Sequence, residues 1–335
     1  MILYNRLRRD VKDITFEVVE NLFHTDKMKR ITENRLAYQK DIRIAQISSR
    51  MNIAGNIVNF DDEKVNNLLQ VWKNRKINTF IVFSGNWGSV LKKYRDYICR
   101  EVVKVCIHMD CDIAPSWKNF NMDCDAAFWI VGNNEHIIDS YIALEDICPT
   151  PFNQRENRLV MHGGGWGIGL ENGIINTICE KGFNLDVISL RNIDMLNGKI
   201  RCFYTNDWQP WGIEEKVFPP LYYNSCNMNL KNIHYINELV KSSIGIISKP
   251  GGGTLMDSFN TATPIIFTTA IAKHEEANAD YWCKNGFGLT FSEWQRNNFS
   301  IEILEECHKN LYKSRINTEN IYYKIKDYLK LDSNV

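Results

Sequence analysis

The chain has 335 residues, which is too long for one ordinary hydrophobic core and suits two domains. Hydrophobic residues make up 44% and charged residues 24%, the usual mix of a globular cytosolic protein, so a cytoplasmic location is expected. Lys plus Arg equals Asp plus Glu at 40 each. This balance excludes a net positive charge whose electrostatic field would attract the protein to nucleic acid.

The first 60 residues do not open with a clear strand–helix–strand order. Alternation favours a strand over residues 14–19, and residues 27–42 favour a helix. The first 50 residues are mildly basic, which usually marks a solvated face and leaves peripheral membrane contact open as a second interpretation. No apolar run approaches the roughly 18–20 residues of a transmembrane segment, and the N-terminus does not resemble a signal peptide.

From about residue 62, strands and helices alternate. Continuous apolar strands separated by helices are typical of a parallel sheet that is covered on both faces. The predicted strands are 79–85, 102–108, 125–132, 158–162, 183–191, 244–248 and 263–269. The predicted helices are 61–76, 89–100, 169–182, 229–243, 254–262, 301–315 and 318–330.

Residues 148–157 contain two prolines and no periodicity, which indicates a linker between domains. The expected domains are therefore residues 1–150 and residues 156–335. The ten cysteines are scattered and form no Cys-x-x-Cys pair, so we expect buried free thiols, no metal site and no cofactor.

Three polar or glycine-rich turns follow predicted strands. The first is HGGGWGIG at residues 162–169, between a strand and a helix. In open parallel sheets, ligands bind outside the carboxyl ends of the strands. Glycine lets a backbone approach a ligand there, and N–H groups at a helix start suit a phosphate. A single glycine-rich turn is weak evidence for phosphate contact, and this one does not fit the dinucleotide-binding pattern.

The second turn, SKPGGGTLMD at residues 248–257, is the stronger signal. A buried strand leads into Lys249, three glycines form the bend, and Thr254 is placed to cap the following helix. Asp257 has two interpretations that do not exclude each other. In the first, Asp257 is the acid of a capping box with Thr254. In the second, its carboxylate accepts hydrogen bonds from ribose hydroxyls. The third turn, KHEEANA at residues 273–279, opens a helix after the next strand.

Together, residues 159–290 resemble the C-terminal donor-binding domain of GT-B glycosyltransferases. The undecaprenyl-peptidoglycan N-acetylglucosaminyltransferase type and the related UDP-glycosyltransferases are the most similar. That family has a Gly-rich turn opening its second domain, as in LVMHGGGWGIG. It continues with a basic residue, glycines, Thr and an acid, as in KPGGGTLMD, and ends with His, Asn-Ala and a Gly-rich close, as in HEEANADYWCKNGFG.

The resemblance implies an α/β, GT-B-like architecture in which two Rossmann-like domains present parallel sheets to a cleft. It also implies a nucleotide-sugar donor of the UDP type and sugar transfer without a bound metal. Residues 1–150 would be the acceptor-side domain and residues 156–335 the donor-binding domain. The donor-binding residues implied are Gly164, Gly165, Trp166, Gly167, Lys249, Gly252, Gly253, Thr254, Asp257, His274, Glu275 and Asn278.

The N-terminal half resembles the family more loosely. His108 ends an apolar strand and is the candidate general base, with Asp110 as its orienting partner or substitute, although a lone His there is equally consistent with a structural role. Two features depart from the family. The chain lacks the glycine-rich loop with His that opens the first domain, and Glu275 stands where relatives often carry Gln.

The sequence thus predicts a glycosyltransferase with an unidentified small-molecule or lipid acceptor. Two alternatives remain. One is a nucleotide-sugar hydrolase or epimerase, and the other is a non-catalytic GT-B-like binding partner, which the missing glycine loop favours.

Overall fold

In the computed structural model, the described residues are 1–51, 60–120, 122–132, 137–190, 198–205, 209, 221–223 and 236–331. The chain divides into two compact units. The smaller unit is Glu17–Asp139, and the larger unit combines Met1–Phe16 with Ser140–Val335. Among the described residues, no helix combines the length and the apolar character needed to cross a bilayer.

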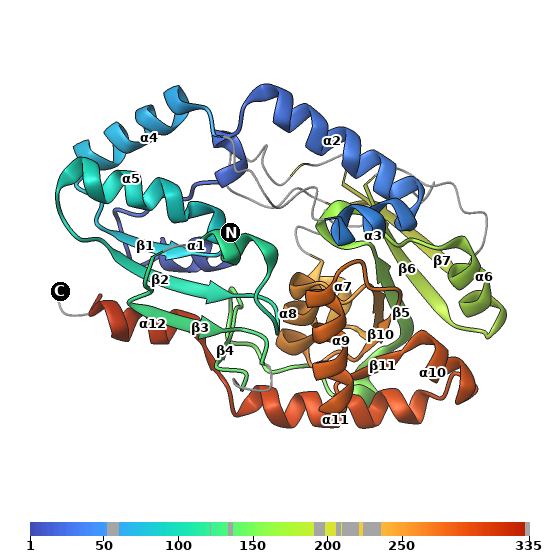
Figure 1. Cartoon of the computed structure of the whole chain (residues 1–335). Coiled ribbons are helices and arrows are strands. Elements are labelled where there is room, and N and C mark those ends of the chain that lie inside the picture. Colours follow the sequence, from blue (N-terminus) through green and yellow to red (C-terminus); the bar gives the residue numbers. More distant parts are fainter. Residues whose placement is uncertain are drawn as a thin grey trace. The chain divides into compact units, whose positions relative to one another are not determined.

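The smaller unit contains a parallel sheet of three strands in the order β1-β2-β3. The strands are β1 (Thr79–Val82), β2 (Val103–His108) and β3 (Ala126–Trp129). The helices are α2 (Thr25–Lys40), α3 (Ile42–Arg50), α4 (Asp62–Asn74) and α5 (Gly88–Ile98). In Figure 1, α4 and α5 lie together along the sheet, and the core between them includes the buried Leu69, Trp72 and Leu91.

These elements confirm most of the predicted order in this part of the chain. The strand predicted over residues 14–19 is wrong, since residues 14–18 are irregular and a short 3-10 helix, Val19–Leu22, follows. Here the apolar side chains of Val19 and Leu22 are buried at helical rather than alternating spacing.

A disulfide joins Cys106 and Cys124, whose Cα atoms are 6.0 Å apart. The expectation of free thiols is therefore wrong for this pair. Cys124 lies two residues before β3, and β3 pairs with β2, which carries Cys106. Strand pairing brings together two cysteines that are 18 residues apart in the sequence, which spacing alone does not indicate.

The larger unit contains a sheet of seven strands in the order β11-β10-β9-β5-β6-β7-β8, parallel except for β8. The strands are β5 (Glu156–His162), β6 (Asn184–Ser189), β7 (Ile200–Tyr204), β8 (Tyr222–Tyr223), β9 (Ser243–Ser248), β10 (Ile265–Phe267) and β11 (Gly288–Thr290). All six residues of β9 are buried, as expected for a central strand covered on both faces.

Most helices of the larger unit follow the alternation predicted from the sequence, but α1 and α10 were not predicted. They are α1 (Ile2–Leu7), α6 (Asn172–Glu180), α7 (Asn237–Val240), α8 (Gly252–Thr261), α9 (Lys273–Lys284), α10 (Phe291–Arg296), α11 (Ile301–Ile316) and α12 (Ile321–Leu329). Helix α7 is the described part of the helix predicted over 229–243, whose residues 229–235 lie outside the described residues.

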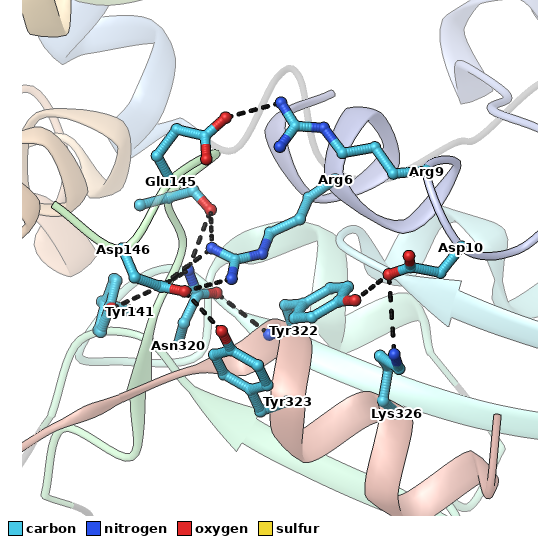
Figure 2. A network of polar contacts seen from close by, with 11 residues as sticks. Arg6, Arg9, Asp10, Tyr141, Glu145, Asp146, Asn320, Tyr322, Tyr323 and Lys326 are labelled. Atoms are coloured by element: carbon cyan, nitrogen blue, oxygen red, sulfur yellow. Dashed lines mark hydrogen bonds and ion pairs between the residues drawn. The ribbon is translucent and has the colours of Figure 1, made fainter. Parts of the chain in front are cut away.

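A polar network joins the two ends of the chain within the larger unit, as Figure 2 shows. Arg6 on α1 forms an ion pair with Asp146, and the hydroxyls of Tyr141 and Tyr323 donate to the same carboxylate at 2.9 and 2.7 Å. Burial would raise the pKa of Asp146, but these hydrogen bonds outweigh it and hold that pKa well below its usual range.

A second pair of contacts extends the network along α12. Tyr322 donates a hydrogen bond to Asp10, and Lys326 lies 3.7 Å from the same carboxylate. A short parallel pair, β4 (Ser140–Tyr141) and β12 (Glu319–Asn320), adjoins it. The first helix therefore lies with the last one in the larger unit.

Candidate functional site

The three turns singled out in the sequence follow adjacent strands of the larger sheet. Strands β5, β9 and β10 are parallel neighbours, so their carboxyl ends lie at one edge. Residues 162–169 leave β5, residues 249–253 leave β9, and the approach to α9 leaves β10. This edge is where open α/β sheets bind ligands.

The first turn depends on glycine for its own shape at two positions. A Cβ on Gly163 would lie 2.4 Å from the backbone of Gly167 and Ile168, and Gly167 itself has a φ of +67°. Gly165 is different, because a Cβ there would meet nothing within 4 Å. Gly165 is exposed, so the shape of the turn does not require a glycine there as it does at Gly163 and Gly167.

The second turn starts helix α8 with glycine. Gly251 is the N-cap residue and provides no side-chain cap, and a Cβ on Gly253 would also meet nothing within 4 Å. The first N–H groups of a helix have no partner inside the helix, and together with the helix dipole they favour an anion. Gly252 and Gly253 present such N–H groups at the sheet edge.

The capping box proposed for Thr254 and Asp257 is wrong. Helix α8 begins at Gly252, so Thr254 is its third residue, and the Thr254 hydroxyl lies 3.4 Å from that of Ser248. Asp257 falls in the second turn of the helix, where it is buried with 7% of its surface exposed. The contact of Asp257 with ribose stays a prediction.

Two backbone N–H groups expected to contact phosphate are engaged within the turns. The N–H of Thr254 donates to the carbonyl of Gly251 at 2.9 Å, and that of Gly167 donates to Gly164 at 3.0 Å. These two N–H groups could therefore contact a phosphate only if those bonds were broken or shared. Trp166, in the first turn, has 37% of its surface exposed.

The third turn is tied to the second by two buried side chains of α9. Glu275 forms an ion pair with Lys249, and its other oxygen accepts from the backbone N–H of Ile271 at 2.8 Å. The Asn278 amide donates to the carbonyl of Pro250 at 2.8 Å. The structure thus brings Lys249, Glu275 and Asn278 together. His274 is half-buried at the second position of α9 and joins none of these contacts within the described residues.

Two residues at this edge were not among the predicted site residues. The Ser248 hydroxyl donates to the carbonyl of His162 at 2.8 Å, and this bond links the ends of β9 and β5. The imidazole of His162 accepts a hydrogen bond at Nδ1 from Gly164, so its proton resides on Nε2. Among the described residues, Nε2 is buried with no hydrogen-bond partner. Burial and the charge of Lys249 lower the pKa of His162 to about 4, so the ring is neutral near pH 7.

The candidate base lies in the smaller unit. His108 ends β2, and its half-buried ring packs between two indoles. The ring centroid is 4.4 Å from that of Trp117 and 4.4 Å from that of Trp129, which is stacked on it. Asp110 follows two residues beyond the strand and is also half-buried. Among the described residues, no group of three or more His, Cys, Asp or Glu side chains is arranged to hold a metal ion.

Comparison with solved structures identifies the architecture. The crystal structure of MurG from Acinetobacter baumannii is 10% identical, with a TM-score of 0.50 over 79% of this chain and 77% of that one. The crystal structure of the glycosyltransferase VinC in complex with dTDP is also 10% identical, with a TM-score of 0.52 over 86% and 79%. The chain has the GT-B glycosyltransferase fold. No protein-family model matches the sequence, and neither does any curated protein.

This GT-B fold has an unusual beginning. Within residues 1–51 and 60–78, no strand precedes β1, and these residues form helices and one isolated bridge between Phe23 and Phe60. The strand and glycine-rich loop with which such proteins were expected to open are not present in those residues. The three turns singled out in the sequence lie in the larger unit, and the opening strand and loop expected from the resemblance are absent from residues 1–51 and 60–78.

Proposed function

We propose that the protein is a glycosyltransferase that moves a sugar from a nucleoside-diphosphate donor, most naturally UDP, to a hydroxyl or amine of a small molecule or lipid. The observation that carries the proposal is the convergence, at one sheet edge, of two glycine turns, the start of α8 and the buried Lys249–Glu275 pair. Among the described residues, no atom lies within 4 Å of a Cβ built at Gly165 or Gly253, so a diphosphate beside the start of α8 would have room to approach both turns.

Seven residues of the edge have a chemical role in this proposal. The N–H groups of Gly252 and Gly253 and the cation of Lys249 would take up the negative charge that develops on the leaving diphosphate. The carboxylate of Asp257 would accept two ribose hydroxyls. Residues of the third turn, His274, Glu275 and Asn278, would line the sugar end of the donor.

Transfer also requires removal of a proton from the acceptor. His108, in the acceptor-side domain, is the proposed base, since a neutral imidazole takes a hydroxyl proton near neutral pH. Asp110 would orient the ring or replace it. The bond between the anomeric carbon and the diphosphate oxygen breaks as the acceptor oxygen bonds to that carbon, and the acceptor proton passes to His108.

The proposal includes catalysis without a bound metal. Turnover is then expected to survive EDTA, whereas loss on chelation that manganese or magnesium restores would contradict this part.

The direct test supplies UDP-sugars with a panel of acceptors and follows UDP release together with the sugar product. A glycosylated acceptor supports transfer. Free sugar or an epimer formed without acceptor would instead support the hydrolase or epimerase alternative. Donor binding without turnover across the panel would support a non-catalytic binding partner. The missing glycine-rich loop at the start of the chain favours this alternative.

A further inference from the structure

The side chain of Lys249 lies between the two glycine turns. A Cβ on Gly251 would lie 3.0 Å from the Lys249 ammonium nitrogen, and one on Gly164 would lie 3.8 Å from Lys249 Cε. The lysine therefore folds back across its own turn and approaches the turn that follows β5. Its cation is placed where a diphosphate held by these turns would bring negative charge.

This cation has a partner within the chain. Glu275 of α9 forms an ion pair with it, and the side chains of Lys249 and Glu275 are only 14% and 7% exposed. The second oxygen of Glu275 keeps a separate hydrogen bond from Ile271 N–H at 2.8 Å. The attraction to Lys249 offsets the cost of removing this carboxylate from water. Much of that cost would be uncompensated if the lysine moved away.

We propose that Glu275 and the donor's diphosphate compete for Lys249, so that Glu275 sets how tightly the site binds phosphate. This inference rests on the proposed function, because it assumes a diphosphate at this edge. An incoming diphosphate must share the ammonium with a carboxylate that remains negative and close. Binding of the donor therefore includes the cost of weakening the Lys249–Glu275 pair.

The test is calorimetric titration of UDP into the wild type and Glu275→Gln. The amide can still accept from Ile271 N–H but no longer holds the lysine by charge. UDP affinity should rise about fivefold to tenfold, within the usual range of coupling between sites. Uridine, which has no phosphate, should bind both proteins equally. The matched control is Glu276→Gln, the same change at the exposed next residue of α9, which should leave UDP affinity unchanged.

A double-mutant cycle shows whether the effect passes through Lys249. Lys249→Met should weaken UDP binding about tenfold or more, while Lys273→Met, at an exposed lysine on the same edge, should not. In the Lys249→Met background, Glu275→Gln should no longer tighten UDP. Melting curves of all variants check that each is folded.

The outcomes separate this inference from the proposed function. If the wild type binds no nucleoside diphosphate, the proposed function fails. If the wild type binds UDP but folded Glu275→Gln binds it no tighter, the competition is overturned and the donor site stands. Equal tightening with and without Lys249 would also overturn it.

Discussion

The backbone N–H of Gly164 donates a hydrogen bond to Nδ1 of His162 at 3.1 Å, within the turn that leaves β5. A ring nitrogen can accept this bond only while it carries no proton, so the shape of the turn is linked to a neutral imidazole. Burial and the nearby Lys249 keep it neutral by lowering the pKa of His162 from 6.5 to about 4. A second histidine, His308 on α11, behaves in the same way. Its pKa is lowered to about 4, mainly by burial and then by the charge of Arg155.

We therefore expect the protein to lose stability as the pH falls from about 6.5 toward 4. In that window the unfolded chain takes up protons at both histidines and the folded chain does not, whereas above pH 7 both states are neutral. At pH 5 the loss should be about 2 kcal/mol per histidine, measured by urea unfolding at pH 7 and pH 5. His162→Asn, which keeps an acceptor but does not titrate, should reduce the pH-dependent loss. A free energy of unfolding that is equal at both pH values would contradict this reading.

Asp257→Asn should weaken UDP binding by about 1–3 kcal/mol, because hydrogen bonds to a charged acceptor are lost. Since Asp257 does not cap α8, no loss of a helix cap contributes to the result. Calorimetry measures the change, with Asp280→Asn, an exposed acid of α9, as the matched control. Unchanged affinity in a folded Asp257→Asn protein would remove Asp257 from the donor site.

The glycines separate ligand contact from folding. Gly253→Ala should stabilise α8 by about 0.5–1 kcal/mol, since alanine is the better helix former, and yet weaken UDP binding. Gly165→Ala should likewise leave folding intact and reduce affinity. Gly163→Ala should destabilise the protein, because its Cβ would lie 2.4 Å from the backbone of Gly167. Melting temperature and UDP affinity, measured on all three variants, separate an effect on folding from an effect on ligand contact. Full affinity in both Gly165→Ala and Gly253→Ala would mean that no ligand uses the empty space.

His108→Ala should lower the turnover rate by about 10²–10⁴-fold, the usual contribution of a positioned base, while UDP affinity stays nearly unchanged. Because the ring packs between Trp117 and Trp129, alanine also leaves a gap between two indoles. His108→Phe keeps an aromatic ring there without a basic nitrogen and should lose as much rate with less loss of stability. A folded variant that keeps more than about a tenth of the rate would move the search for the base to Asp110.

Much of the donor side could be predicted from the sequence, because buried parallel strands are continuous apolar runs and glycine marks their exits. The convergence of Lys249, Glu275 and Asn278 follows from the order of the strands, since β9 and β10 are neighbours in the sheet. Other features depend on contacts that no local pattern encodes. Arg6 reaches Asp146 across 140 positions of sequence, and helix α8 starts two residues before Thr254, which removed the capping box.

The central claim is that the larger unit binds a nucleoside diphosphate, and calorimetric titration tests it most directly. UDP, dTDP and GDP would each be titrated into the 335-residue chain, with the parent nucleosides as controls for the contribution of the phosphates. UDP is expected to bind with a dissociation constant in the micromolar range, about −7 to −8 kcal/mol. No measurable binding of any of the three at millimolar concentration would contradict the account.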